Sequence, residues 1–115
     1  MTPLVIYVDV DDTLIRSVGS KRIMMTHSVK QVKALHAEGA ELYCWSSGGA
    51  EYAKASAVEA GIEDCFKDFL PKPQVMLDDQ PVEDWKYLTY LHPNNAGSKT
   101  VGELDPMRDL RRERL

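Results

Sequence analysis

The sequence lacks the features of a membrane or secreted protein. Its longest unbroken apolar run, Leu4 to Val8, covers five residues, whereas about 20 are needed to span a bilayer. No positively charged stretch followed by an apolar one opens the chain, which is the pattern of a secretory signal. We therefore expect a protein that does not bind or cross membranes and is not exported.

Cysteine and excess positive charge are also scarce. Cys44 and Cys65 do not form a C-x-x-C pair, and two cysteines are too few for a disulfide scaffold or a four-cysteine zinc site. This predicts a reduced, cytoplasmic protein. The 14 Lys and Arg against 18 Asp and Glu give a net charge of −4, which disfavours nonspecific binding to nucleic acid but leaves room for a local basic patch.

The composition fits one folded domain. With 115 residues, 43% hydrophobic and 28% charged, the chain is long enough for a single core and too short for two. We therefore expect one domain over residues 1–115. The sequence does not indicate an oligomeric state.

Apolar strands and amphipathic helices are expected to alternate along the chain. Leu4 to Val8 is β-branched and apolar without alternation, which is typical of a parallel strand covered on both faces. Further strands are expected at 41–45, 66–70, 74–77 and 87–91. A helix is expected from Ser28, capped together with Gln31, to Gly39, and another from Ala50 to Ala60. The order predicts a three-layer α/β fold with a five-stranded, mainly parallel sheet and helices on both faces.

Three segments lie outside this alternation. Residues 16–26 are too long for a tight loop, and Gly19-Ser20 between apolar neighbours predicts a small hairpin flap. Pro81 starts a brief helical turn. Residues 94–115 form a C-terminal extension that ends in an amphipathic segment with Met107, Leu110 and Arg114 on one helical face.

Acidic residues are concentrated directly after the first strand. Asp9, Asp11 and Asp12 occupy three of four consecutive positions at the carboxyl end of a buried parallel strand, the edge where open α/β sheets bind ligands. A solvated turn explains one or two of these acids. Three of them repel one another unless a cation or a proton offsets the charge, which favours a metal or catalytic site.

Other polar residues follow the remaining strands. Asp78-Asp79 ends the strand at 74–77, so their carboxylates converge with the first cluster if the two strands are adjacent. Carboxylates without Cys or His nearby suit Mg²⁺ and argue against zinc. Ser46 and the amides of Ser47 and Gly48 would favour an anion at the same edge. With Lys72 adding positive charge, this set suits phosphoryl transfer.

Four segments resemble the motifs of the haloacid dehalogenase superfamily of phosphatases and phosphotransferases. Residues 8–14 (VDVDDTL) resemble its DxDxT motif, and residues 42–48 (LYCWSSG) its hydrophobic strand ending in Ser or Thr. Lys72-Pro73 is similar to the third motif and residues 76–79 (MLDD) to the fourth. They occur in the family's order over residues 4–91. The resemblance implies a Rossmannoid fold, with the strands ordered 5-4-1-2-3.

The resemblance also implies a role for each motif residue. Asp9 would be the nucleophile that forms an aspartyl-phosphate, and Asp11 the general acid that later activates water. Mg²⁺ would be held by Asp9, by the main-chain carbonyl of Asp11 and by Asp79, with Asp78 supporting it. Ser46 would hydrogen-bond the phosphoryl group and Lys72 would neutralise it. Because Lys72 lies close to the fourth motif in sequence, Lys67 is the alternative lysine.

The expected function is Mg²⁺-dependent hydrolysis of a phosphomonoester. The motifs leave no room for a cap domain, so the resemblance implies an open site for a bulky or macromolecular phosphorylated substrate, met by Arg16, Lys21 and Arg22 of the flap. One alternative is a receiver-like signalling domain, although Ser46 takes the place of the phospho-accepting Asp at its middle strand. Another is a catalytically silent phosphate-binding module, although Asp9 and Asp11 are both present.

Overall fold

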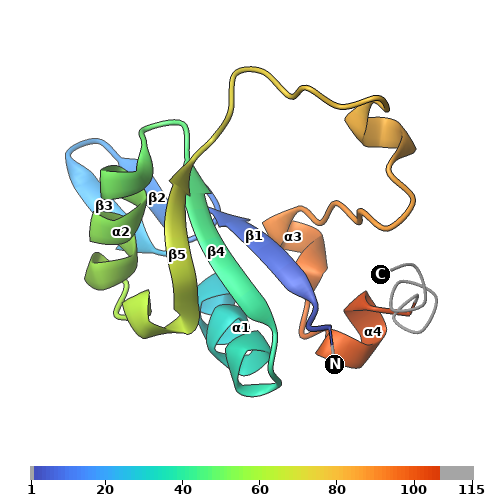
Figure 1. Cartoon of the computed structure of the whole chain (residues 1–115). Helices are drawn as coiled ribbons and strands as arrows, with labels where there is room; N and C mark the ends of the chain where they lie inside the picture. Colours follow the sequence, from blue (N-terminus) through green and yellow to red (C-terminus); the bar gives the residue numbers. More distant parts are fainter. Residues whose placement is uncertain (1, 107–115) are drawn as a thin grey trace.

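Two small sheets and a set of short helices form the part of the chain that the structure, a computed structural model, describes, residues 2–106. The parallel strands β1 (Val5–Asp9), β4 (Glu41–Ser46) and β5 (Phe66–Pro71) form one sheet in the order β1-β4-β5 (Figure 1). Strands β2 (Ile15–Val18) and β3 (Lys21–Met24) form an antiparallel hairpin. The predicted α/β class, the order of the first three sheet strands and the hairpin flap are confirmed.

The pairing of the parallel strands brings their carboxyl ends to one edge. In the register of β1 with β4, Asp9 lies opposite Trp45. In the register of β4 with β5, Ser46 lies opposite Pro71. Because all three strands run in the same direction and end level with one another, the residues that follow them share one rim of the sheet.

Helices α1 (Thr26–Ala37) and α2 (Ala50–Glu59) supply side chains to the core beneath the sheet. Strand β4 alternates strictly, with Leu42, Cys44 and Ser46 buried on the core side. Small residues Ala53 and Ala57 let α2 approach β4 closely. The short helix η1 (Glu63–Cys65) then leads into β5. The core also contains Val10, Leu14, Ile15, Val32, Leu35, Ile62 and Phe66.

The fourth and fifth strands predicted at 74–77 and 87–91 are not formed, so the five-stranded sheet was wrong. Residues 72–92 instead make a wide loop that contains the short helix η2 (Val82–Asp84), which follows Pro81 as expected (Figure 1). Val75 is 81% and Leu77 102% exposed. Pro71 and Pro73 lack the N–H groups that a ladder needs, and within residues 2–106 no strand pairs with the outer edge of β1.

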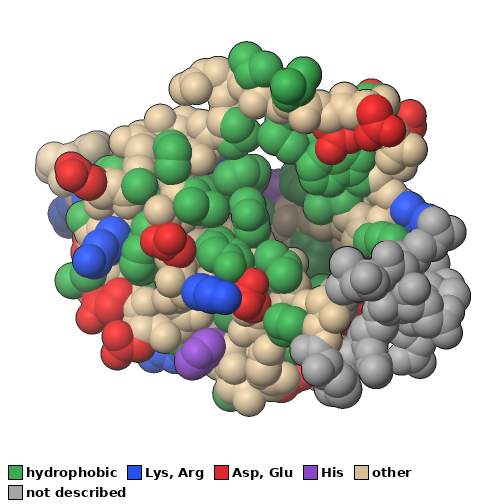
Figure 2. Space-filling model, in the orientation of Figure 1, with side chains coloured by type: hydrophobic (Ala, Val, Ile, Leu, Met, Phe, Trp, Pro, Cys, Tyr) green, Lys and Arg blue, Asp and Glu red, His purple; other side chains and the backbone are tan. Residues whose placement is uncertain are grey.

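The second face of the sheet carries aromatic side chains instead of the predicted helix layer. Tyr7, Tyr43 and Trp45 alternate with the core residues of their strands, and Tyr7 is 48% exposed. The Tyr7 ring centroid lies 5.3 Å from that of Tyr43 and 4.9 Å from that of Trp45. Figure 2 shows hydrophobic side chains gathered over the sheet. The three-layer arrangement is therefore absent from the described residues, and the aromatic rings cover one another.

Helix α1 begins earlier than predicted, and its first turn docks on a later segment. Its N-cap is Met25, without a side-chain cap, and Ser28 is buried inside the helix rather than capping it. His27 Nε2 lies 3.0 Å from the Gly97 carbonyl oxygen, and Gln31 donates to the Ala96 carbonyl at 3.4 Å. These contacts position helix α3 (Pro93–Ala96) beside α1.

The C-terminal extension contains one further short helix. Thr100 and Glu103 form a capping box that starts α4 (Val101–Leu104). The amphipathic helix predicted around Met107, Leu110 and Arg114 lies outside the described residues. Within residues 2–106, no helix has the length and apolar character required to cross a membrane.

Candidate functional site

Three of the predicted site residues lie at the carboxyl ends of the three parallel strands. Asp9 is the last residue of β1, Ser46 is the last residue of β4, and Lys72 directly follows β5. The strands that hold them are neighbours in the sheet. The structure therefore places these residues at the edge where α/β sheets bind ligands, with the Asp9 and Lys72 side chains in contact and the Ser46 side chain buried on the core side of β4.

Lys72, and not Lys67, is the lysine at Asp9. Its Nζ lies 3.0 Å from Asp9 Oδ1 and 5.8 Å from the centroid of the Trp45 ring. Lys67 instead pairs with Glu41 at 3.1 Å, at the start of β4 and far along the strand from Ser46. The other Asp9 oxygen, Oδ2, accepts a hydrogen bond of 3.4 Å from Thr13 Oγ1. The Asp9 carboxylate is thus held from two sides.

Ser46 links the first turn after β4 to the segment after β5. Its carbonyl oxygen accepts the N–H of Gly49 at 3.1 Å and the N–H of Lys72 at 2.9 Å. Its Oγ, which is buried with the rest of the residue, accepts the Gly48 N–H at 3.0 Å. The Ser46 hydroxyl hydrogen remains to be donated, whereas the Gly48 amide, predicted to face an anion, is engaged by Ser46. Ser47 is exposed.

The loop after Asp9 is a tight turn anchored in the core. The Val10 carbonyl accepts the N–H groups of Thr13, Leu14 and Ile15, at 3.2, 2.9 and 3.2 Å. Val10 and Leu14 are fully buried, so the turn cannot shift without disturbing the core. Asp12 adopts a φ of 60°, a conformation that Asp tolerates better than most residues. Its carboxylate is exposed and lies 3.9 Å from Arg16.

Asp11 has a partner that the sequence analysis missed. The hydroxyl of Tyr52, on the first turn of α2, donates to Asp11 Oδ1 at 2.7 Å. The pair is separated by 41 residues, and no local pattern connects them. The only hint in the sequence is that Tyr52 follows the Ser46 to Gly49 turn by one helical turn, which places it beside the same edge of the sheet.

The acidic pair Asp78-Asp79 does not reach this edge. Both residues are exposed in the loop after β5, where Asp78 Oδ1 accepts the Gln80 N–H at 2.9 Å. In residues 2–106, no group of three His, Cys, Asp or Glu side chains is close enough to hold a metal ion. The described structure therefore does not gather the side chains of Asp9, Asp11, Asp78 and Asp79 into one such group, and the Mg²⁺ site stays a prediction.

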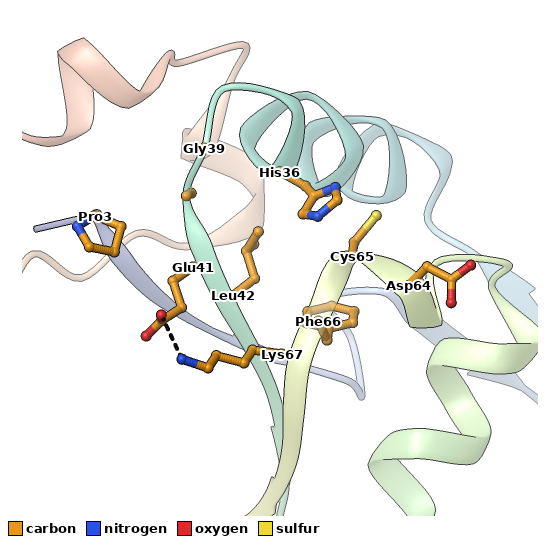
Figure 3. A pocket seen from close by; sticks show the side chains of 10 residues that line it. Pro3, His36, Gly39, Glu41, Leu42, Asp64, Cys65, Phe66 and Lys67 are labelled. Carbon is orange, nitrogen blue, oxygen red and sulfur yellow. Dashed lines mark hydrogen bonds and ion pairs between the residues drawn. The ribbon is translucent and has the colours of Figure 1, made fainter. Parts of the chain in front are cut away.

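Two hollows of the described surface lie away from Asp9. One, of about 320 Å³, is at the opposite end of the sheet, where β4 and β5 begin; Figure 3 shows the Glu41–Lys67 pair on its wall. Lys67 and Tyr43 both donate to Glu41, which lowers the pKa of that carboxyl. Another hollow, of about 530 Å³, includes Asp78 and Asp79. Neither hollow includes Asp9, Ser46 or Lys72, and the Asp9 and Lys72 side chains are 32% and 34% exposed, so the rim is open to solvent.

Comparisons of the chain with protein-family models, with curated proteins and with solved structures give no match. Asp9, Ser46 and Lys72 lie at the strand ends, and Asp11 is held by Tyr52 beside them.

Proposed function

We propose that this protein is a phosphomonoester hydrolase that works through an aspartyl-phosphate on Asp9, with a fold of the haloacid dehalogenase type. The observation that carries the proposal is the 3.0 Å pairing of Lys72 Nζ with Asp9 Oδ1 beside the end of β4, where Ser46 lies. A nucleophile, a cation and a hydroxyl donor on neighbouring strand ends suit a reaction whose main demands are positioning and charge neutralisation.

The reaction consists of two displacements at phosphorus. An Asp9 carboxylate oxygen attacks phosphorus, and the bond from phosphorus to the leaving oxygen breaks as Asp11 gives that oxygen a proton. Water then attacks the phosphorus of the aspartyl-phosphate while Asp11 takes its proton, which releases inorganic phosphate and restores Asp9. Lys72 offsets the negative charge of the transferring group, and Ser46 donates its hydroxyl hydrogen to it.

Mg²⁺ is the proposed cofactor of this reaction. The resemblance implies oxygen ligands from Asp9, the Asp11 carbonyl and the Asp78-Asp79 pair. The loop position of that pair leaves the donor set incomplete. If Asp79 nevertheless supplies a ligand, Asp79→Asn will weaken Mg²⁺ binding measured by calorimetry, while Asp84→Asn in the nearby η2 helix will not.

The open rim supports a substrate larger than a small metabolite. Between β1 and α1, a stretch that the structure describes throughout, the β2–β3 hairpin is the only insertion. Few groups can therefore contact the leaving part of a small substrate. Arg16 and Lys21 are exposed on the hairpin and would meet a bulky or macromolecular phosphoester. Arg22, predicted to do the same, is bound to α2 instead.

A substrate panel with two matched variants tests the proposal. The purified chain is incubated with a small aryl phosphate, a phosphopeptide and a terminally phosphorylated oligonucleotide, with Mg²⁺ or with a chelator. We expect phosphate release by the wild type, and neither release nor a phosphoenzyme in intact-mass spectra of Asp9→Asn. Asp12→Asn, which removes an exposed neighbouring carboxylate, should remain active. Activity that survives Asp9→Asn would contradict the proposal.

The second candidate is a receiver-like or catalytically silent phosphate-binding module. The position of Asp78-Asp79 in an exposed loop favours it, because turnover of an aspartyl-phosphate would lack the support expected from those acids. In that case the protein binds a phosphorylated partner, or retains the phosphoryl group on Asp9, without repeated release of phosphate. A phosphoenzyme that persists after the phosphodonor is removed would favour this function over hydrolysis.

A further inference from the structure

A chain of hydrogen bonds joins the hairpin, helix α2 and Asp11. Arg22 on β3 donates from Nε to both Glu59 oxygens, at 2.9 and 3.2 Å, and from NH2 to Ser56 Oγ at 3.2 Å. Its NH1 donates to Tyr52 Oη at 2.9 Å, and Tyr52 Oη lies 2.7 Å from Asp11 Oδ1. These residues come from three separate segments, so the network exists only in the folded protein.

The direction of each bond in this chain is determined by the donors. A guanidinium group has N–H donors and no acceptor, so the Tyr52 oxygen accepts from Arg22. Its single hydrogen is then free to point at Asp11 Oδ1. Hydrogen bonds to Tyr52 and Glu59 raise the pKa of Arg22, so the guanidinium remains charged. Asp11 therefore always receives a donor at Oδ1, which leaves Oδ2 to exchange a proton with a ligand.

The Tyr52 ring is fixed by packing as well as by its hydroxyl. A Cβ atom at Gly48 would lie 2.9 Å from Tyr52 Cδ2, so the ring occupies space that only glycine leaves free. On another side, the Arg22 guanidinium carbon lies 5.4 Å from the ring centroid. Gly48 itself donates to Ser46 Oγ. The ring thus rests against the same turn that carries the Ser46 hydroxyl.

We propose that Tyr52 is a positioning residue that aims Asp11 at the leaving oxygen, with Arg22 setting the direction of its hydroxyl. The proposal builds on the proposed phosphatase function, in which Asp11 gives a proton to that oxygen. In this proposal Arg22 orients the Tyr52 hydroxyl and does not bind the substrate. Tyr52 holds one Asp11 oxygen, which restricts rotation of the side chain and would keep the other oxygen free for the leaving oxygen.

Tyr52→Phe removes the hydroxyl and keeps the ring that packs on Gly48. We expect its effect on kcat/KM to depend on the leaving group, because kcat/KM reports the steps up to departure of the alcohol. For alkyl phosphates, whose alcohol must be protonated as it leaves, kcat/KM should fall about tenfold or more. For nitrophenyl phosphate, whose phenolate leaves without help, the fall should be less than about threefold.

Two further variants distinguish a loss of Asp11 positioning from a general loss of structure. Gly48→Ala displaces the Tyr52 ring but keeps its hydroxyl, and it should show the same dependence on the leaving group. Tyr43→Phe removes a tyrosine hydroxyl that also donates to a carboxylate, Glu41 at 2.9 Å, and should change neither substrate class. Circular dichroism and thermal melting confirm that each variant is folded.

A stability measurement, which does not depend on catalysis, tests the contact between Tyr52 and Asp11. In thermal melts of Tyr52→Phe, Asp11→Asn and the double variant, the shift of the double variant should be smaller than the sum of the two single shifts. Additive shifts, or an equal loss for alkyl and nitrophenyl phosphates in Tyr52→Phe, overturn the inference while the phosphatase function stands. A wild type that hydrolyses no phosphoester refutes the phosphatase function, and the positioning role falls with it.

Discussion

Replacement of Lys72 by methionine removes the cation that pairs with Asp9. The two charges lie 3.0 Å apart, with side chains 34% and 32% exposed. At this distance two unit charges attract by about 1.4 kcal/mol in bulk water and by about 5.5 kcal/mol at an effective permittivity of about 20. Solvent contact and desolvation reduce the upper value, which leaves about 2 to 3 kcal/mol as the scale of the attraction that Lys72 would offer a phosphoryl group in the proposed reaction. We therefore expect kcat/KM to fall about 30- to 150-fold.

The assay is phosphate release by Lys72→Met against matched Lys67→Met. Lys67 also forms a salt bridge with a carboxylate, Glu41 at 3.1 Å, but at the other end of β4. Lys67→Met should keep kcat/KM within about twofold of the wild type, because a solvent-exposed ion pair contributes little. Equal losses in the two variants, or an unchanged Lys72→Met, would refute the assignment of Lys72 to the phosphoryl group.

Three other predictions concern the body of the protein. Leu14→Ala removes a fully buried side chain and should lower the free energy of unfolding by about 2 to 5 kcal/mol in a urea titration. The lowered pKa of Glu41 means that its contribution to stability is present above about pH 4.5 and is lost as the pH falls further. The Tm difference between wild type and Glu41→Gln should therefore shrink as the pH falls below about 4.5, and a difference that stays constant in acid would contradict this cause. Burial raises the pKa of Cys44 to about 12, so a thiol reagent at neutral pH should leave it unmodified until the protein unfolds.

The strands that were predicted correctly from the sequence are those in which an apolar pattern coincides with a neighbouring strand to pair with. β1 and β4 combine apolar, β-branched or aromatic residues with a defined partner, and β5 follows at the spacing of a βαβ unit. Residues 74–77 have a similar composition, yet Val75 and Leu77 are exposed. A strand forms only where a neighbouring edge accepts its hydrogen bonds, and composition does not say whether that edge is reached.

The candidate site was predictable where it depends on strand ends and not where it depends on long-range contacts. Asp9, Ser46 and Lys72 follow three strands in the sequence, so the parallel topology alone brings them to one rim. The contact of Tyr52 with Asp11 depends on how α2 is rotated against β4. That rotation is determined by core packing around Ala53 and Ala57, which sequence periodicity does not resolve.

The two hydrogen bonds accepted by the Ser46 carbonyl couple two segments of the rim. Because one oxygen binds the N–H groups of both Gly49 and Lys72, the backbone that carries the serine hydroxyl and the backbone that carries the lysine move as a single unit. Bending of β4 would displace both together without altering the distance between their main chains. A ligand that moves the turn after β4 would therefore also move the start of the segment after β5.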